Sequence, residues 1–144
     1  MVKAHLLDHA KAVAKVVRVC RPGGWVVVCD VYTTTPEQAA EYDRLERLRD
    51  PSHVHALRLE ELRALLSDAT LDKRTEAFAR LPMQLERLLA SSFPVRGGAD
   101  EIRRTFAADL GRDFLNLGIH AEGEGIAFEF PVVVLAGTKP ADRG

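Results

Sequence analysis

Cysteine is scarce in this chain, and long apolar segments are absent. The 144 residues include two cysteines, Cys20 and Cys29, which form neither a CxxC pair nor a disulfide framework. Such cysteine usage favours a reducing compartment. The uncharged apolar runs are too short to span a bilayer, and no basic segment followed by an apolar run and a cleavage site begins the chain. The sequence therefore predicts a soluble, cytoplasmic protein.

An excess of charge of either sign is also absent. The chain has 20 lysines and arginines against 21 aspartates and glutamates, which gives a formal net charge of -1. No overall field therefore attracts nucleic acid or an anionic membrane. We expect neither as a partner, so any partner must be recognised locally.

Motifs for phosphate, metal or nucleophilic chemistry are missing as well. The sequence has no GxGxxG turn between a strand and a helix and no GxxxxGK[ST] loop, so no backbone cradle for a nucleotide can be identified. The pairs His5/His9 and His53/His55 have spacings that can share a metal, but neither accompanies a cysteine or carboxylate constellation of known spacing. We expect no metal site, and spacing supports no Ser/His/Asp triad.

The remaining composition is that of one ordinary globular domain. Hydrophobic residues make up 47% of the chain and charged residues 28%, which is enough for a real core. Apolar residues at helical spacing predict a helix over 3–20, which the letters RPGG end. The segment from Trp25 to Cys29 is apolar at every position. This pattern predicts a strand over 25–31 that is buried on both faces and has neighbours on both sides.

The rest of the chain continues to mix helices and strands. This order is typical of an α/β fold with about three strands. Proline and glycines separate the last two helices, which we interpret as a helical insertion or lid over 82–117 within one domain spanning 1–144. Further helices are expected at 36–49, 58–69, 83–93 and 99–117, and further strands at 71–79 and 126–136.

Polar side chains gather at two places suited to binding. Asp30 and Tyr32 end the strand at 25–31, and open α/β sheets bind ligands beyond the carboxyl ends of their strands. Arg49, Asp50 and His53 lie in the connection RLRDPSHVH, where histidine can exchange protons near neutral pH. Each also has a structural explanation: Asp30 can cap a turn, Tyr32 can edge a core, and Asp-Pro-Ser can form a turn beside a satisfied histidine.

Two stretches of the chain resemble a known family, the class I S-adenosylmethionine-dependent methyltransferases of the ubiquinone and menaquinone biosynthesis group (methyltransferase type 11). They are RVCRPGGWVVVCDVY and LERLRDPSHVHALRLEELRALL. The first resembles the helix, Pro-Gly-Gly turn and fifth strand of that fold, and the second a subgroup pattern, lErlRDPSHvraL. The resemblance continues to IAFEFPVVVLAG. It implies the C-terminal half of a Rossmann-like fold, in which the strand at 25–31 pairs with the strand at 126–136 and its other neighbour precedes Met1.

The resemblance also implies roles for residues. It places His5 near the cofactor. Arg58 stands where a capping Ser or Thr is expected, and Thr70 where a helix-ending glycine is usual. Residues implied to line or cover the acceptor pocket are Asp30, Tyr32, Arg49, Asp50 and, as the catalytic candidate, His53.

The implied activity is methyl transfer from S-adenosylmethionine to a small-molecule acceptor, in which the protein chiefly aligns the reacting groups and excludes water. The cofactor-binding half would lie before Met1, so we expect the activity of these residues alone to be incomplete. A non-enzymatic remnant or interaction module is the alternative, because an unpaired edge of the strand at 25–31 favours a homodimer or other strand pairing. A small-ligand-binding protein with a helical lid is a third interpretation.

Overall fold

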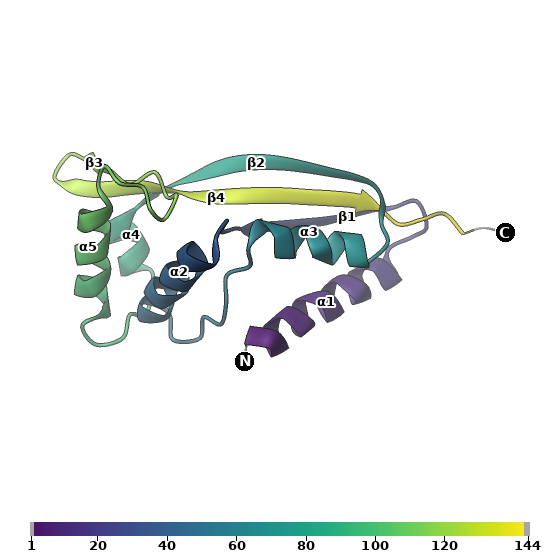
Figure 1. Ribbon diagram of the computed structural model, residues 1–144, viewed down its shortest axis with the longest axis horizontal. Helices are drawn as coiled ribbons and strands as arrows, with labels where there is room; N and C mark the ends of the chain where they lie inside the picture. The colour runs from purple at the N-terminus through teal and green to yellow at the C-terminus, as the bar shows by residue number, and fades with distance from the viewer. Residues whose placement is uncertain (1, 143–144) are drawn as a thin grey trace.

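The fold is a small, strongly elongated α/β arrangement (Figure 1). The computed structural model describes residues 2–142, and describes side chains from residue 8 onward. No helix among these residues has the length and hydropathy needed to cross a membrane. The elements in chain order are α1 (Val2–Val19), β1 (Trp25–Val31), α2 (Pro36–Arg49), α3 (Leu59–Asp68), β2 (Asp72–Gln84), α4 (Leu85–Ala90), α5 (Gly98–Asp109), β3 (His120–Glu122) and β4 (Gly125–Thr138).

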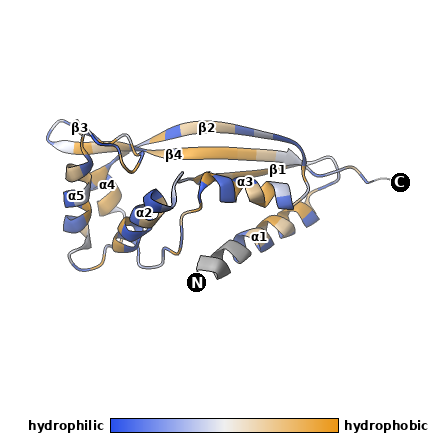
Figure 2. Cartoon of the chain, in the orientation of Figure 1, coloured by the Kyte–Doolittle hydropathy of each residue, from blue (hydrophilic) through white to orange (hydrophobic). Residues whose placement is uncertain are grey.

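The long strand β4 is the centre of the sheet. The strand order is β1-β4-β2, with β4 antiparallel to both neighbours, and the short β3 also pairs with β4. Trp25 lies opposite Thr138 and Val31 opposite Val132. The predicted pairing of the strand at 25–31 with the closing strand is therefore confirmed. Figure 2 shows β4 largely in the colour of apolar residues, as expected for a strand with neighbours on both edges.

Local sequence signals set several boundaries. Gly23 has a φ of 76°, and a Cβ on Gly24 would lie 2.7 Å from the Sγ atom of Cys20, so the turn into β1 needs both glycines. Helix α2 begins after Thr35, whose hydroxyl accepts the Gln38 N–H, and its first residue is Pro36. Predicted bounds for β1 and α2 match the structure.

Helices cover β4 at two places. Near its carboxyl end, Val133 and Leu135 pack with Leu62 and Leu66 of α3. Near its amino end, Phe128 packs with residues of α2, α4 and α5. Because consecutive strand residues point to opposite faces, these two cores lie on opposite faces of β4.

Three sequence predictions are corrected by the structure. The strand at 25–31 is not buried on both faces, because Trp25 is 56% exposed and Val27 is 57% exposed. Strand β2 continues past Pro82 to Gln84, since a proline at the edge of a sheet costs no ladder bond on its outer side. The last helix ends at Asp109 instead of residue 117. The insertion over 82–117 stays a prediction.

Candidate functional site

The carboxyl end of β1 holds two of the predicted residues. The exposed Asp30 accepts the N–H of its neighbour Val31 on Oδ1 at 2.8 Å. Tyr32 is half-buried beside the α3 core, and its ring meets Phe78 edge-on with centroids 5.7 Å apart. Thr33, next in the chain, is 2% exposed, and its hydroxyl has no hydrogen-bond partner within the described part of the chain.

Arg49 ends helix α2 in a shielded ion pair. Its Nε donates to Glu46 Oε1 at 3.0 Å, and its Nη1 donates to Ser92 Oγ at 3.1 Å. The hydrogen bonds from Arg49 to Glu46 raise the pKa of this guanidinium against the opposing effect of burial. Arg49 therefore stays charged and joins α2 to the segment that follows α4.

A small cavity with aromatic walls lies beside this ion pair. Its volume is about 20 Å³, little more than one water molecule needs. Burial and then the Glu46 carboxylate raise the pKa of Tyr42 well above its ordinary value, and the Asp30 charge adds to this effect. The Tyr42 hydroxyl is thus a protonated donor. Apolar residues complete the lining: Leu45, Leu88, Ile102, Phe106, Leu117, Phe128 and Phe130.

Asp43, one residue along α2 from Tyr42, holds two histidines of the RDPSHVH connection. Its Oδ1 accepts from His53 Nε2 at 2.8 Å and from the Ala56 N–H at 2.7 Å, while Oδ2 accepts from His55 Nδ1 at 2.8 Å. Burial alone would raise the Asp43 pKa, but the hydrogen bonds from His53, Ala56 and His55 outweigh burial and lower it. An ionised Asp43 only accepts, so both ring nitrogens that face it carry protons.

The connection is anchored at both ends. His55 Nε2 lies 3.5 Å from Glu61 Oε2, and the same carboxylate oxygen accepts the Arg58 N–H at 2.8 Å. Glu61 thus supplies one half of a capping box before α3, the bond to the Arg58 N–H. Asp50 accepts the N–H and hydroxyl of Ser52 at 2.9 and 2.7 Å, which closes the Asp-Pro-Ser turn.

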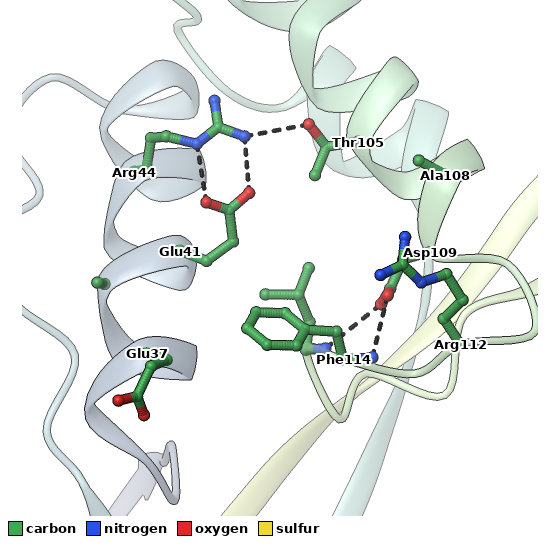
Figure 3. A pocket seen from close by; sticks show the side chains of 10 residues that line it. Glu37, Glu41, Arg44, Thr105, Ala108, Asp109, Arg112 and Phe114 are labelled. Atoms are coloured by element: carbon green, nitrogen blue, oxygen red, sulfur yellow. Dashed lines mark hydrogen bonds and ion pairs between the residues drawn. The ribbon is translucent and has the colours of Figure 1, made fainter.

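A wider groove lies between α2 and α5 (Figure 3). Its volume is about 530 Å³, but none of the predicted site residues lines it. Arg44 is bound to Glu41 and Thr105, and the Asp109 carboxylate accepts the N–H groups of Phe114 and Leu115. Because the predicted residues lie at the ends of β1 and α2, we take these ends as the candidate site.

The described residues hold no cluster suited to a metal ion, and their tightly packed glycines face other protein atoms. No group of three His, Cys, Asp or Glu residues there can hold a metal ion. Three glycines approach other atoms too closely to tolerate a Cβ, and each of those atoms belongs to the protein: Cys20 Sγ at Gly24, Leu48 O at Gly98 and Leu71 Cβ at Gly137. None of these glycines therefore forms a cradle open to a ligand.

Comparisons with known proteins decide the relationship. The sequence matches no protein-family profile. It is 30% identical over 143 residues to the uncharacterized methyltransferase YcgJ of Bacillus subtilis (strain 168), covering 94% of this chain and 54% of that protein. The chain is similar to this methyltransferase over almost its whole length. It spans about half the length of this methyltransferase relative, in agreement with the predicted partial fold.

Solved structures support the methyltransferase fold. The crystal structure of YcgJ from Bacillus subtilis superposes with a TM-score of 0.77 at 23% identity, covering 92% of this chain and 58% of that one. A putative methyltransferase from Bacillus halodurans superposes with a TM-score of 0.76 at 17% identity, covering 92% and 63%. The predicted α/β class and partial methyltransferase fold are therefore confirmed.

The structure brings only part of the predicted site together. Arg49 lines the aromatic cavity, and the charge of Asp30 helps to raise the pKa of Tyr42, which lines the same cavity. His53 is held by Asp43, whereas Asp50 serves the Ser52 turn. His5 lies among the residues whose side chains are not described.

Sequence reasoning missed three side chains that hold the site together: Tyr42, Asp43 and Glu46. Of these, only Glu46 carried a signal, the i, i+3 spacing to Arg49 on a predicted helix.

Proposed function

We propose that this chain takes part in methyl transfer from S-adenosylmethionine to a small-molecule acceptor in the cytoplasm, and that it supplies the acceptor side of the site. The observation that carries the proposal is the match to methyltransferases over more than nine-tenths of the chain. The position of the candidate residues supports it, because ligands of open α/β sheets bind beyond the carboxyl ends of the strands.

The cofactor is proposed to be held by residues other than those described. Bound there, S-adenosylmethionine would supply the methyl group. The sequence has no strand-to-helix glycine turn of the cofactor-binding type, and the chain spans 54% of its curated relative. We therefore assign no step on the cofactor to these side chains.

The acceptor is proposed to be a small apolar molecule with one polar group. The cavity beside α2 is lined by aromatic and aliphatic side chains, and its polar groups are the Tyr42 hydroxyl and the Glu46–Arg49 pair. Apolar walls with a few fixed polar groups are typical of small-molecule sites. Since the cavity holds little more than one water, α4 and α5 would have to move to admit an acceptor.

His53 is the proposed acid or base toward the acceptor, because its ring centroid lies 6.4 Å from that of Tyr42, which lines the cavity. Asp43 fixes its ring through Nε2 at 2.8 Å, as a carboxylate does in catalytic His–Asp pairs. His55, bound to the other oxygen of Asp43 and close to Glu61, is a positioning residue for the same connection.

A chimera tests the division of labour between the two parts. The 144 residues replace the matched part of the Bacillus subtilis relative, and both the chimera and the chain alone are titrated calorimetrically with S-adenosylmethionine. We expect the chimera to bind in the micromolar range and the chain alone to bind more weakly than about 1 mM. Tighter binding by the chain alone would refute the division, and a folded chimera that does not bind would refute the methyl-transfer proposal.

The alternative is a non-catalytic interaction module. The observation that favours it is the apolar edge strand β1, on which Trp25 and Val27 are more than half exposed. A chimera that binds the cofactor argues against a purely non-catalytic protein.

A further inference from the structure

Strand β2 forms the edge of the sheet that lies away from β1 (Figure 1). In the order β1-β4-β2, the strand β4 separates β2 from β1 and from the sheet neighbour of β1 that the methyltransferase resemblance places before Met1. Among the described strands β2 pairs only with β4, and over 75–84 the pairing runs without a shift in register. The open outer edge of β2 therefore does not depend on that neighbour of β1.

The register identifies the residues of β2 that bond outward. The Tyr32 N–H, just after β1, donates to Pro131 O at 3.2 Å, so the odd-numbered residues of β4 turn their backbone groups toward β1. The even-numbered residues of β4 turn toward β2, where Val134 lies opposite Ala77. The odd-numbered residues of β2 thus bond inward, and the even-numbered residues of its regular part bond outward: Glu76, Phe78, Arg80 and Pro82.

The outward-bonding residues present an anion, an aromatic ring and a cation in turn. Phe78 is 51% exposed. Glu76 accepts two hydrogen bonds from Arg63 of α3, at 2.7 and 2.8 Å. Arg80 donates to the backbone and side-chain oxygens of Asn116, each at 2.7 Å, and both oxygens are neutral. Within the described part of the chain, Arg80 has no carboxylate partner, so its charge is open to one from outside.

This pattern is complementary to itself. In an antiparallel pair centred on Phe78, the two Phe78 rings meet, and Glu76 of each copy meets Arg80 of the other. Sliding the copies by two residues sets Phe78 against a charge, and sliding them by four sets Glu76 against Glu76 or Arg80 against Arg80. Opposite charges and aromatic rings that face each other across a strand pair are stabilising, whereas like charges are destabilising. The centred register is therefore favoured.

We propose that the outer edge of β2 is a docking surface for a second copy of this chain, which pairs antiparallel about Phe78 and sets Glu76 of each copy against Arg80 of the other. Edge charges usually discourage strand pairing. Here they favour one register, which joins two β1-β4-β2 sheets through about six backbone hydrogen bonds, two for each of three residue pairs. This proposal is independent of the methyl-transfer proposal, and either can fail alone.

Charge reversal followed by mixing tests the docking on the 144-residue chain. In sedimentation equilibrium we expect a species of twice the 15.9 kDa chain mass at micromolar concentrations. Glu76→Arg and Arg80→Glu each set two pairs of like charges opposite each other, and each should weaken self-association at least tenfold. An equimolar mixture of the two variants should form a mixed dimer, because two arginines on one chain then face two glutamates on the other.

Two control variants and the mixture decide the result. Arg104→Glu reverses an exposed, ion-paired arginine on α5, and Val27→Lys changes the exposed β1; both should leave association unchanged. Circular dichroism verifies that each variant is folded. A chain that stays monomeric at 100 micromolar would overturn the proposal. So would equal effects of Arg80→Glu and Arg104→Glu, loss of the dimer in Val27→Lys, or two folded charge variants that do not associate when mixed.

Disulfide trapping tests the register. In a background with Cys20→Ser and Cys29→Ser, Phe78→Cys places a thiol opposite its own copy, within the Cα separation that a disulfide spans. We expect a covalent dimer on mild oxidation. Leu81→Cys is the matched control, because Leu81 is 52% exposed on the same strand but faces Thr75 of the second copy in the centred register. A covalent dimer from Leu81→Cys and none from Phe78→Cys would contradict that register.

Discussion

Replacing Asp43 with alanine should lower the free energy of unfolding by about 3 kcal/mol, the low end for removing one partner of a buried pair. Asp43 is 4% exposed and accepts hydrogen bonds from His53, His55 and the Ala56 N–H. Its loss leaves three donors without their acceptor inside the connection between α2 and α3. Hydrogen bonds to charged groups contribute about 1.5–3 kcal/mol each, but the imidazoles can turn to solvent and recover part of the loss.

Urea unfolding followed by circular dichroism measures this change. Asp43→Asn keeps an acceptor and should lose less than the alanine variant. Asp100→Asn, on the exposed start of α5, is the control and should stay within about 0.5 kcal/mol of the unmodified chain. If the alanine variant lies as close to the unmodified chain as this control does, Asp43 does not organise the connection and the account of the site is wrong.

The stability difference between the unmodified chain and Asp43→Ala should also depend on pH in a definite direction. Because the folded-state pKa of Asp43 is lowered below its ordinary 3.8, its contribution is present above that value and is lost as the pH falls through the lower folded pKa. The gap between the unmodified chain and Asp43→Ala should therefore shrink as the pH falls below about 4. A gap that does not shrink there would contradict the ionised, hydrogen-bonded carboxylate.

Three further substitutions follow from single features of the structure. Thr70 has a φ of 55°, which is strained for a residue with a side chain and unstrained for glycine. Thr70→Gly should therefore raise the free energy of unfolding by about 1 kcal/mol and the melting temperature by roughly 3 °C in calorimetry, and an unchanged melting temperature would show that Thr70 is not strained. Leu62 is 0% exposed in the α3 core, so Leu62→Ala should cost about 3 kcal/mol in urea unfolding, and a cost below 1 kcal/mol would mean that α3 is loosely packed. Glu46→Leu and Arg49→Leu should each lower the free energy of unfolding by about 2 kcal/mol, because each leaves one buried charge without its partner. The double variant should lose less than the sum of the two, and strictly additive losses in urea unfolding would show that the two side chains do not interact.

Local signals explain why some elements could be predicted from the sequence. The bounds of β1 and α2 follow from RPGG and from Thr35-Pro36, which act on neighbouring residues only. The end of α5 could not be predicted in the same way. Apolar residues continue at helical spacing to Leu117, but the carboxylate of Asp109 binds the N–H of Phe114 and holds the chain in turns.

The candidate site shows the same limit. Asp43 stands 10 residues before His53 and 12 before His55, so no spacing rule connects them before the connection folds back on α2. The exposure of β1 could not be predicted either. An apolar stretch such as 25–31 indicates that its side chains favour burial, but it does not indicate which other segments cover them.

The most direct test of the central claim is methyl transfer by the chimera with and without the acceptor-side candidate. Tritium transfer from labelled S-adenosylmethionine to small molecules of a cell extract is measured alongside cofactor affinity. The account predicts that His53→Ala lowers transfer at least about a hundredfold, the low end of general acid–base effects, and leaves cofactor affinity within about twofold. Unchanged transfer, or an equal loss of cofactor binding, would contradict an acceptor-side role for this chain.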